Sequence, residues 1–200
     1  MAQRAAEPLL SEDGYLALEQ KSEVKHEYFA GEMFAMAGGT LNHSLIASNF
    51  NSHLRSLLSG RGCLVFTSDL RVKIVATGLF TYPDVSVVCG PPDLLHQPSD
   101  TLVNPTLIVE VLSESTEAYD RGTKFDHYRQ IPSLTTYLLV NQDRARIEQF
   151  IRHTDFEWRN RVANGLDAVM ELPALGVSIS PSEIFSDVKF ASSSGRSFPI

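Results

Sequence analysis

Two acidic residues, Asp84 and Glu110, stand in stretches of the chain that are otherwise apolar. Glu110 interrupts the run 107–112, LIVEVL, and Asp84 follows Pro83 and precedes the run 85–89, VSVVC. Short runs rich in β-branched residues are typical of strands that are buried on both faces. An ionised carboxylate in such a strand costs on the order of several kcal/mol unless a cation or hydrogen bonds compensate for its burial. Both acids are therefore candidates for a functional site.

The chemistry open to these two acids depends on whether their strands are neighbours. If they are, the carboxylates of Asp84 and Glu110 converge at one end of a sheet, and such a pair can hold a hard divalent cation when a substrate phosphate completes the coordination shell. The alternative is a structural ion pair between Glu110 and a nearby cation, since buried pairs of that kind also occur.

The same residues resemble a known nuclease pattern. Pro83-Asp84 followed by a strand that bears Glu110 resembles the PD-(D/E)XK nuclease superfamily. More narrowly, residues 15–185 resemble the Uma-two family of endonucleases, in the tracts 27–36, His43, 82–88, 109–116, 120–128 and Tyr137. The most specific part is the tract EVLSEST, which starts at Glu110, followed by Asp120-x-x-x-Lys124.

This resemblance implies a fold and an activity. The expected fold is α/β with a restriction-endonuclease-like core, in which helices flank a mixed central β-sheet, and with an N-terminal hairpin. The expected activity is that of a metal-dependent phosphodiesterase, most simply a DNA endonuclease that uses Mg²⁺ or Mn²⁺. The metal ligands would be Asp84, Glu110 and the backbone carbonyl of Val111. DNA is the expected substrate, and a homodimer is plausible because cutting both strands usually takes two sites.

The chain departs from the superfamily pattern at one position. The pattern places a lysine two residues after the acid, where this chain has Leu112. Lys124 is the natural substitute, because a helix after the strand can project its ammonium group into the same site. The alternative is that Lys124 only pairs with Asp120 at i,i+4 on a solvated face.

Two further residues are candidate members of the site. Glu32 and His43 would act as a water-mediated ligand or would position the substrate, and His is also the commonest general acid or base. Against this, a histidine beside an apolar helix stripe, as His43 is, is often a structural residue.

Two alternative interpretations of the whole chain stay open. One is a catalytically inactive nuclease-fold module that binds nucleic acid or protein, which Leu112 and the acidic composition favour. The other is a structural Asp–Glu–Lys cluster with no ligand. The net charge of 17 − 24 = −7 argues against a general electrostatic grip on nucleic acid. A local basic cleft stays possible, with candidates Arg121, Lys124, Arg129, Arg144, Arg146 and Arg152.

Composition places the protein among single-domain soluble chains. With 43% hydrophobic and 20% charged residues, its 200 residues suit one globular domain, expected over 11–190, after a loose leader, 1–10, and before a mobile tail, 191–200. No signal peptide or membrane-spanning run is visible. The two cysteines, Cys63 and Cys89, are interpreted as small core residues in a reducing compartment. We therefore expect a cytoplasmic protein with no membrane contact.

The elements that must position the candidates follow from periodicity and turn residues. Apolar residues at helical spacing predict a long helix over 41–58. Turn signals predict a hairpin over 26–36 around Ala30-Gly31, and a second hairpin of two strand-like runs, 63–75 and 80–89, through Thr77-Gly78. Residues 90–104 are expected to be a loop. The remaining expected elements are a helix that Ser115 or Thr116 caps and that reaches 131, strands over 135–140 and 147–152, a segment over 169–179 that closes the core, and a short helix over 181–185.

Overall fold

The computed structural model describes residues 9–95, 101–155 and 157–190. The α-helices of these residues are α1 (Glu12–Glu19), α2 (Leu41–Leu57), α3 (Glu117–Arg121), α4 (Thr123–Tyr128) and α5 (Pro181–Ile184), with a 3₁₀ helix, η1 (Pro173–Leu175). The strands are β1 (His26–Phe29), β2 (Glu32–Ala35), β3 (Cys63–Thr67), β4 (Arg71–Ile74), β5 (Leu79–Thr81), β6 (Val85–Cys89), β7 (Thr101–Leu102), β8 (Leu107–Leu112), β9 (Thr136–Asn141), β10 (Arg146–Arg152), β11 (Trp158–Asn164), β12 (Met170–Leu172) and β13 (Val177–Ile179).

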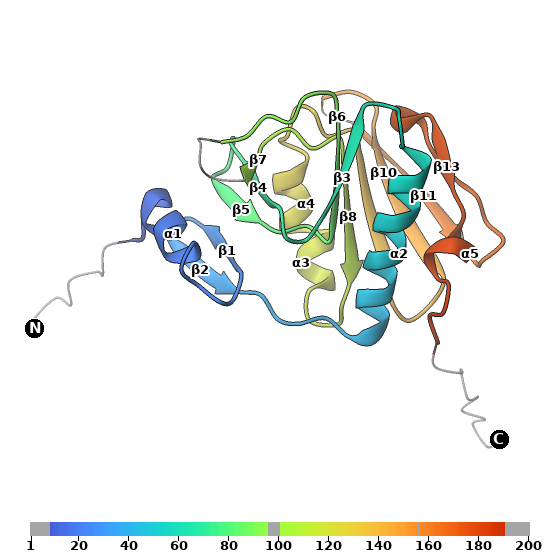
Figure 1. Cartoon of the computed structure of the whole chain (residues 1–200), viewed down its shortest axis with the longest axis horizontal. Coiled ribbons are helices and arrows are strands. Elements are labelled where there is room, and N and C mark those ends of the chain that lie inside the picture. The colour runs from blue at the N-terminus through green and yellow to red at the C-terminus, as the bar shows by residue number, and fades with distance from the viewer. Residues whose placement is uncertain (1–8, 96–100, 156, 191–200) are drawn as a thin grey trace, which may run out of the picture.

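A mixed six-stranded sheet forms the centre of the molecule. Its strand order is β11-β10-β9-β8-β6-β3, in which β8 and β9 run parallel and the other neighbours are antiparallel. The helices α2 and α5, with the β12–β13 pair, pack on one face of this sheet, and α4 packs on the other (Figure 1). The predicted α/β class, with helices on both faces of a mixed sheet, is therefore confirmed.

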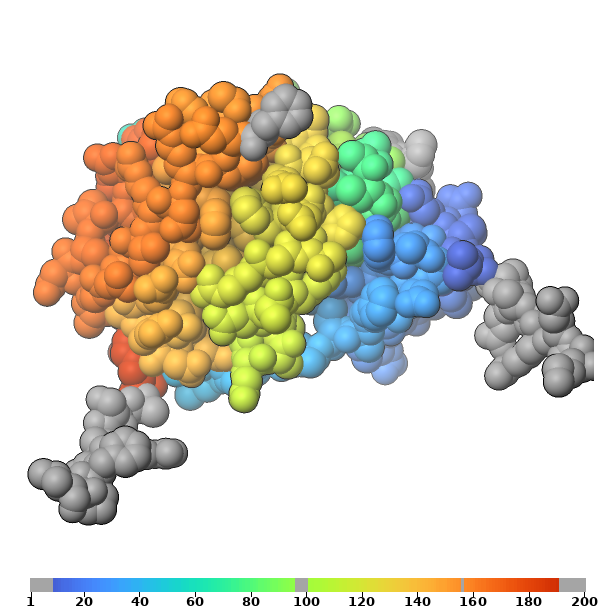
Figure 2. All heavy atoms as spheres, turned by 180° about the vertical axis from the view of Figure 1, so that it is seen from behind, coloured from blue at the N-terminus to red at the C-terminus, as the bar shows by residue number. Residues whose placement is uncertain are grey.

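The N-terminal hairpin belongs to a second sheet that was not predicted. This five-stranded sheet has the order β2-β1-β5-β4-β7. The turn between β1 and β2 lies at Ala30 and Gly31, whose φ angles of 51° and 91° are both positive, as a two-residue hairpin of the favoured twist requires. The predicted hairpin over 26–36 is confirmed. Seen from behind, it lies beside the segment of α3 and α4 (Figure 2).

The prediction that runs 63–75 and 80–89 each form one long strand is wrong. Each run divides in two, so that β3 and β6 pair in the six-stranded sheet while β4 and β5 pair in the five-stranded sheet. Pro83 lies at one division, where a residue without a backbone N–H can end a ladder of hydrogen bonds. The predicted loop 90–104 likewise contains β7, which pairs with β4 in parallel.

The segment after β8 forms two short helices instead of one. Thr116 is the N-cap residue of α3, although its side chain makes no capping hydrogen bond. Gly122 then separates α3 from α4 with φ −108° and ψ −102°, values outside the helical region. The helical part of the segment ends at Tyr128, short of the predicted residue 131.

The ends of the predicted domain are described only in part. Residues 1–8 of the predicted leader and the whole predicted tail, 191–200, lie outside the described residues, so the domain boundaries stay a prediction. Leu9 and Leu10 are described, and the backbone N–H of Leu10 donates to the carbonyl of Gly31 in the hairpin turn. None of the helices in the described part of the chain has both the length and the apolar composition needed to cross a lipid bilayer.

The interpretation of the cysteines as free core residues is wrong. The register of β3 and β6 places Cys63 directly opposite Cys89, and the two form a disulfide. Sequence patterning could not show this, because the two residues are 26 positions apart and only the strand register brings them together. The inference of a reducing compartment rested on two free cysteines, and the disulfide removes that support.

The disulfide leads to a prediction about stability. Closing a loop of this length restricts the unfolded chain, so the double variant Cys63→Ala/Cys89→Ala is expected to lose roughly 2–4 kcal/mol of unfolding free energy. The measurement is urea unfolding with and without dithiothreitol. Reductant should lower the midpoint of the wild type and leave that of the double variant unchanged; an equal response of both proteins would contradict the disulfide.

Candidate active site

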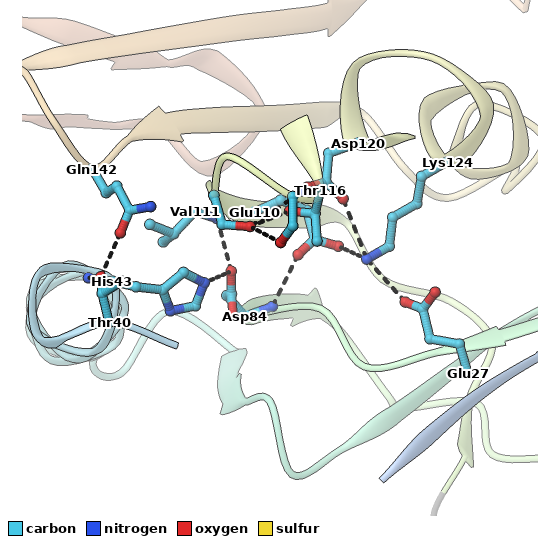
Figure 3. Close-up of polar contacts among 12 residues, drawn as sticks. Glu27, Thr40, His43, Asp84, Glu110, Val111, Thr116, Asp120, Lys124 and Gln142 are labelled. Carbon is cyan, nitrogen blue, oxygen red and sulfur yellow. Dashed lines mark hydrogen bonds and ion pairs between the residues drawn. The ribbon is translucent and has the colours of Figure 1, made fainter. Parts of the chain in front are cut away.

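A cavity of about 880 Å³ opens where the two sheets and three helices meet. Because β6 and β8 are antiparallel, with Val85 opposite Val109, the start of β6 and the end of β8 lie at the same end of the sheet. Asp84 and Glu110 therefore come together at this end, and both line the cavity (Figure 3). Side chains of β8 alternate between faces, and Glu110 points to the face that carries α4.

Asp84 is held by three groups. Its Oδ2 atom accepts a hydrogen bond of 2.7 Å from the backbone N–H of Val111 and lies 3.2 Å from His43 Nε2. Its own backbone N–H lies 3.4 Å from Glu110 Oε2. Asp84 and Glu110 are thus coupled through the backbone, so neither carboxylate can turn without disturbing the other.

The ammonium group of Lys124 lies among three carboxylates. Its Nζ atom is 2.9 Å from Glu110 Oε1, 3.0 Å from Glu27 Oε1 and 3.5 Å from Asp120 Oδ1 (Figure 3). The lysine side chain is only 6% exposed. Burial alone would lower the pKa of Lys124, but the three carboxylates outweigh it and hold that pKa well above its usual value, so the ammonium stays charged.

The cavity carries more negative charge than its cations neutralise. Burial raises the pKa of Glu110 to about 8, against the opposing effect of Lys124. Burial also raises the pKa of Asp120 above its usual value. The hydroxyl of Tyr128 donates a 2.6 Å hydrogen bond to Glu110 Oε1. Six acidic residues line the cavity with one lysine and one histidine. Because the raised pKa values disfavour the charged forms of Glu110 and Asp120, an additional cation would stabilise those charged forms.

The start of α2 positions His43. Thr40 is the N-cap, its Oγ1 accepts from the backbone N–H of His43 at 3.1 Å, and its hydroxyl donates to Gln142 Oε1 at 2.5 Å. Gly39 packs so closely on the imidazole that an added Cβ would lie 2.7 Å from His43 Nδ1. The hydrogen bond with Asp84 raises the pKa of His43 above its usual value. The histidine therefore favours the charged form beside Asp84.

The structure brings most of the predicted site residues together. Asp84, Glu110, Lys124, His43 and the backbone of Val111 all line one cavity. Their catalytic and metal-binding roles stay predictions.

Glu32 is the exception among the predicted residues. It is exposed at the start of β2 and does not line the cavity. Instead Glu27 on β1 contributes its carboxylate to Lys124 and accepts a hydrogen bond from Thr81. The two glutamates belong to the same hairpin, and only the packing of the hairpin against α4 distinguishes them. The site role of Asp120 was also missed, although its spacing of four from Lys124 was a usable signal.

The donor atoms suit a hard divalent cation. Among the described residues, no group of three or more His, Cys, Asp or Glu side chains is arranged to hold a metal ion. Mg²⁺, however, is commonly held by one or two carboxylates, with water and substrate phosphate completing the shell. Asp84 and Glu110 could supply such a pair, and the excess negative charge of the cavity favours the ion.

The candidate basic residues do not form a free basic surface. Two of them, Arg121 and Arg146, bind the same carboxylate, Glu148, with Arg121 contacting both of its oxygens at 2.8 and 2.9 Å. Arg152 donates to backbone carbonyls around the end of α4, and Arg129 pairs with the exposed Asp126. The pairing of Arg121 with Glu148 fixes α3, and with it Asp120, on β10.

Comparisons with known proteins agree with this architecture. A family model described as "Uma2: Putative restriction endonuclease" matches residues 13–182. Two proteins of Synechocystis sp. are similar over most of their length: the uncharacterized protein slr1290 is 39% identical over 183 residues, covering 92% of this chain and 95% of that protein, and the uncharacterized protein sll1609 is 33% identical over 167 residues, covering 84% and 94%.

A solved structure shares the fold. The crystal structure of a protein from Anabaena variabilis, described as "a putative nuclease belonging to DUF820", superposes with a TM-score of 0.71 at 20% sequence identity, covering 88% of this chain and 98% of the other. The expected restriction-endonuclease-like core is confirmed by this likeness.

The position of Lys124 predicts a large effect of its removal. Lys124→Met leaves the neighbouring carboxylates without their shared cation, so we expect a loss of roughly 3–5 kcal/mol of unfolding free energy at pH 7. The matched control is Lys25→Met, which breaks the surface pair with Asp69 and should cost at most about 1 kcal/mol. Urea unfolding in EDTA measures both. Equal small losses would mean that the ammonium group of Lys124 is not buried among the carboxylates.

The anchor of α3 predicts a pH dependence. Hydrogen bonds from Arg121 lower the pKa of Glu148 below its ordinary value of 4.5. The stability that Glu148 contributes is therefore full above pH 4.5 and is lost as the pH falls through the lowered folded-state pKa. We expect Glu148→Gln to be less stable than the wild type by roughly 1–3 kcal/mol at pH 7. Urea unfolding at pH 7 and pH 3 should show this difference shrinking in acid; a constant difference would contradict it.

Proposed function

Because the chain belongs to the Uma2 family, whose model is described as "Putative restriction endonuclease", we propose that it is a metal-dependent phosphodiesterase that cleaves DNA internally. The resemblance to this family inferred from the residues alone is thereby confirmed. A nuclease is what the family and the shared fold support; the metal, the DNA substrate and the residue roles are our proposal.

One observation supports this proposal above the others. Asp84 and Glu110 lie side by side in one cavity with the ammonium group of Lys124 2.9 Å from Glu110, although the sequence has leucine at the position where the superfamily has its lysine. A helix thus supplies the cation that the strand lacks. Two acids and an ammonium group come together as in the superfamily pattern, but the ammonium group comes from the helix α4 and not from the strand β8.

Each side chain has a part in the proposed reaction. Asp84 and Glu110, with the backbone carbonyl of Val111, would hold Mg²⁺ or Mn²⁺. The bound ion would supply a low-pKa water and neutralise negative charge on the phosphoryl oxygens. Lys124 would donate hydrogen bonds to the attacking water or to a phosphoryl oxygen.

The surrounding residues support those three. Glu27 and Asp120 keep the ammonium of Lys124 charged and directed at Glu110. His43, whose pKa the hydrogen bond with Asp84 raises, would hold the orientation of that carboxylate and carry a proton close to the scissile phosphate. In the hydrolysis, water adds to phosphorus and one P–O ester bond breaks, which leaves a phosphate monoester and a hydroxyl group.

Two further expectations belong to the proposal. Cleavage of both strands of a duplex would be served by a homodimer with two such cavities. A cytoplasmic location is compatible with a DNA substrate.

A second candidate function is a nuclease-fold module without cleavage. The acidic lining of the cavity favours it, since Glu27, Glu114, Asp120 and Asp143 all face the space that a phosphate would enter. Isothermal titration calorimetry with Mn²⁺ separates the two functions. The phosphodiesterase binds Mn²⁺ in a manner that Asp84→Ala abolishes, whereas the inactive module can stay folded without binding the ion.

The activity itself gives a direct test. Supercoiled plasmid incubated with the wild type and Mg²⁺ or Mn²⁺ should be nicked, and Asp84→Ala should slow nicking by on the order of 100-fold or more, because it removes a ligand and the partner of His43. The matched control, Asp126→Ala, removes an exposed aspartate on α4 and should leave the rate unchanged. EDTA should abolish nicking. Equal nicking by the wild type and Asp84→Ala would remove the assignment.

A further inference from the structure

A second cavity, of about 400 Å³, lies between α2 and the end of β3. It is lined on one side by residues of α2 and on the other by Thr67 and Ser68, and it reaches Asp84, which also lines the large cavity. We call this space the α2–β3 groove. Because Asp84 lines both cavities, the groove begins at the carboxylate where the proposed reaction takes place.

The groove uses the polar face of α2. Ser48, Asn51, Ser52 and Arg55 recur at spacings of three and four, which places them on one side of the helix. The opposite side of α2 carries the buried residues Ile46, Phe50 and Leu54. From Ser48 to Arg55 the helix rises about 10 Å, so these side chains follow the groove along the helix.

The groove offers hydrogen-bond donors that the protein itself does not use. Asn51 Nδ2 is buried and has no hydrogen-bond partner in the described structure. Within the same described ranges Arg55 forms no ion pair, in contrast to Arg121 and Arg146, which share Glu148. An unmatched amide N–H and a free guanidinium in one groove are the groups that bind anionic oxygens.

The two cavities differ in the balance of their charged residues. Asp84 is the single acid that lines the groove, and Arg55 balances it, whereas the large cavity is lined by several further carboxylates. A polyanion that reaches Asp84 is repelled by the rest of the large cavity and meets donors in the groove.

We propose that the α2–β3 groove binds the phosphodiester backbone of the DNA strand next to the bond that is cleaved, with Arg55 and Asn51 as donors to its phosphate oxygens. This inference rests on the proposed function, since it takes the reacting phosphate to lie at Asp84. The hydroxyl groups of Ser48 and Ser52, which also line the groove, add further donors. Such contacts hold the strand without reading base edges, so they contribute affinity to all sequences alike.

The experiment measures DNA binding apart from cleavage. Fluorescence anisotropy with two fluorescein-labelled duplexes of unrelated sequence, in Ca²⁺ in place of Mg²⁺ or Mn²⁺, gives the dissociation constant over a range of salt concentrations. Arg55→Ala is expected to weaken binding of both duplexes roughly 10-fold and to lower the slope of log K against log salt by about 1. Arg159→Ala, which removes the same charge from β11 at the far edge of the sheet, should bind as the wild type does.

A second pair of variants tests the groove while Arg55 and Asn51 are both kept. Ser52→Glu places a carboxylate in the groove, and Ser52→Gln places a neutral side chain of similar size there. The glutamate variant should bind both duplexes several-fold more weakly than the glutamine variant, by charge repulsion. Urea unfolding confirms that each variant is folded.

The outcomes separate this inference from the proposed function. If Arg55→Ala and Ser52→Glu both keep the wild-type affinity and salt slope, the groove does not bind DNA. The nuclease assignment, which plasmid nicking tests, would be unaffected. If the wild type nicks no plasmid but binds DNA in a way that the groove variants weaken, the groove binds DNA and the proposed phosphodiesterase activity is wrong. A wild type that nicks plasmid but binds neither duplex would overturn the groove alone, and a wild type that neither binds nor nicks would overturn both.

Discussion

The ammonium group of Lys124 is the contact on which the arrangement of the site depends. It joins a strand of the central sheet through Glu110, the N-terminal hairpin through Glu27 and its own helical segment through Asp120. These three parts of the chain have no other reason to place carboxylates together, since like charges in a dry site repel one another. Lys124 therefore lets carboxylates from both sheets lie close together at one cavity.

The chain carries its buried ammonium group on α4 and has no lysine on β8. Leu112 occupies the position two residues after Glu110 and packs in the core on the α4 side of the sheet, where it is 3% exposed. A lysine there would need a partner in an apolar cluster, which is costly. Moving the ammonium to α4 leaves the strand wholly apolar apart from its acid. The short helices α3 and α4, broken at Gly122, then aim Asp120 and Lys124 at Glu110.

Features that depend on local sequence could be predicted, and features that depend on contacts between distant residues could not. Asp84 and Glu110 were predictable, because an acid in an apolar run is visible without knowledge of its neighbours, and α2 and the first hairpin follow from local periodicity and turn residues. The division of 63–75 and 80–89 between two sheets was missed. Ser68-Asp69 and Pro83-Asp84 interrupt the two runs locally, but only pairing across the fold shows that the halves of each run join different sheets. Glu27 and Glu32 could not be told apart for the same reason, and the pairing of Cys63 with Cys89 depends on register. Long-range contacts were the missing information, and the family resemblance supplied it for Lys124, His43 and Val111, which line the cavity with the two acids.

The disulfide between Cys63 and Cys89 constrains one end of β6 more than the other. At one end the strand is tied covalently to β3, and at the other it runs into Pro83, which cannot extend the ladder, and then into Asp84. Because the disulfide holds β3 and β6 together at one end, we expect transient opening of the β3–β6 ladder to start at the other end, next to Asp84. The covalent tie lies at the opposite end of β6 from Asp84 and the large cavity.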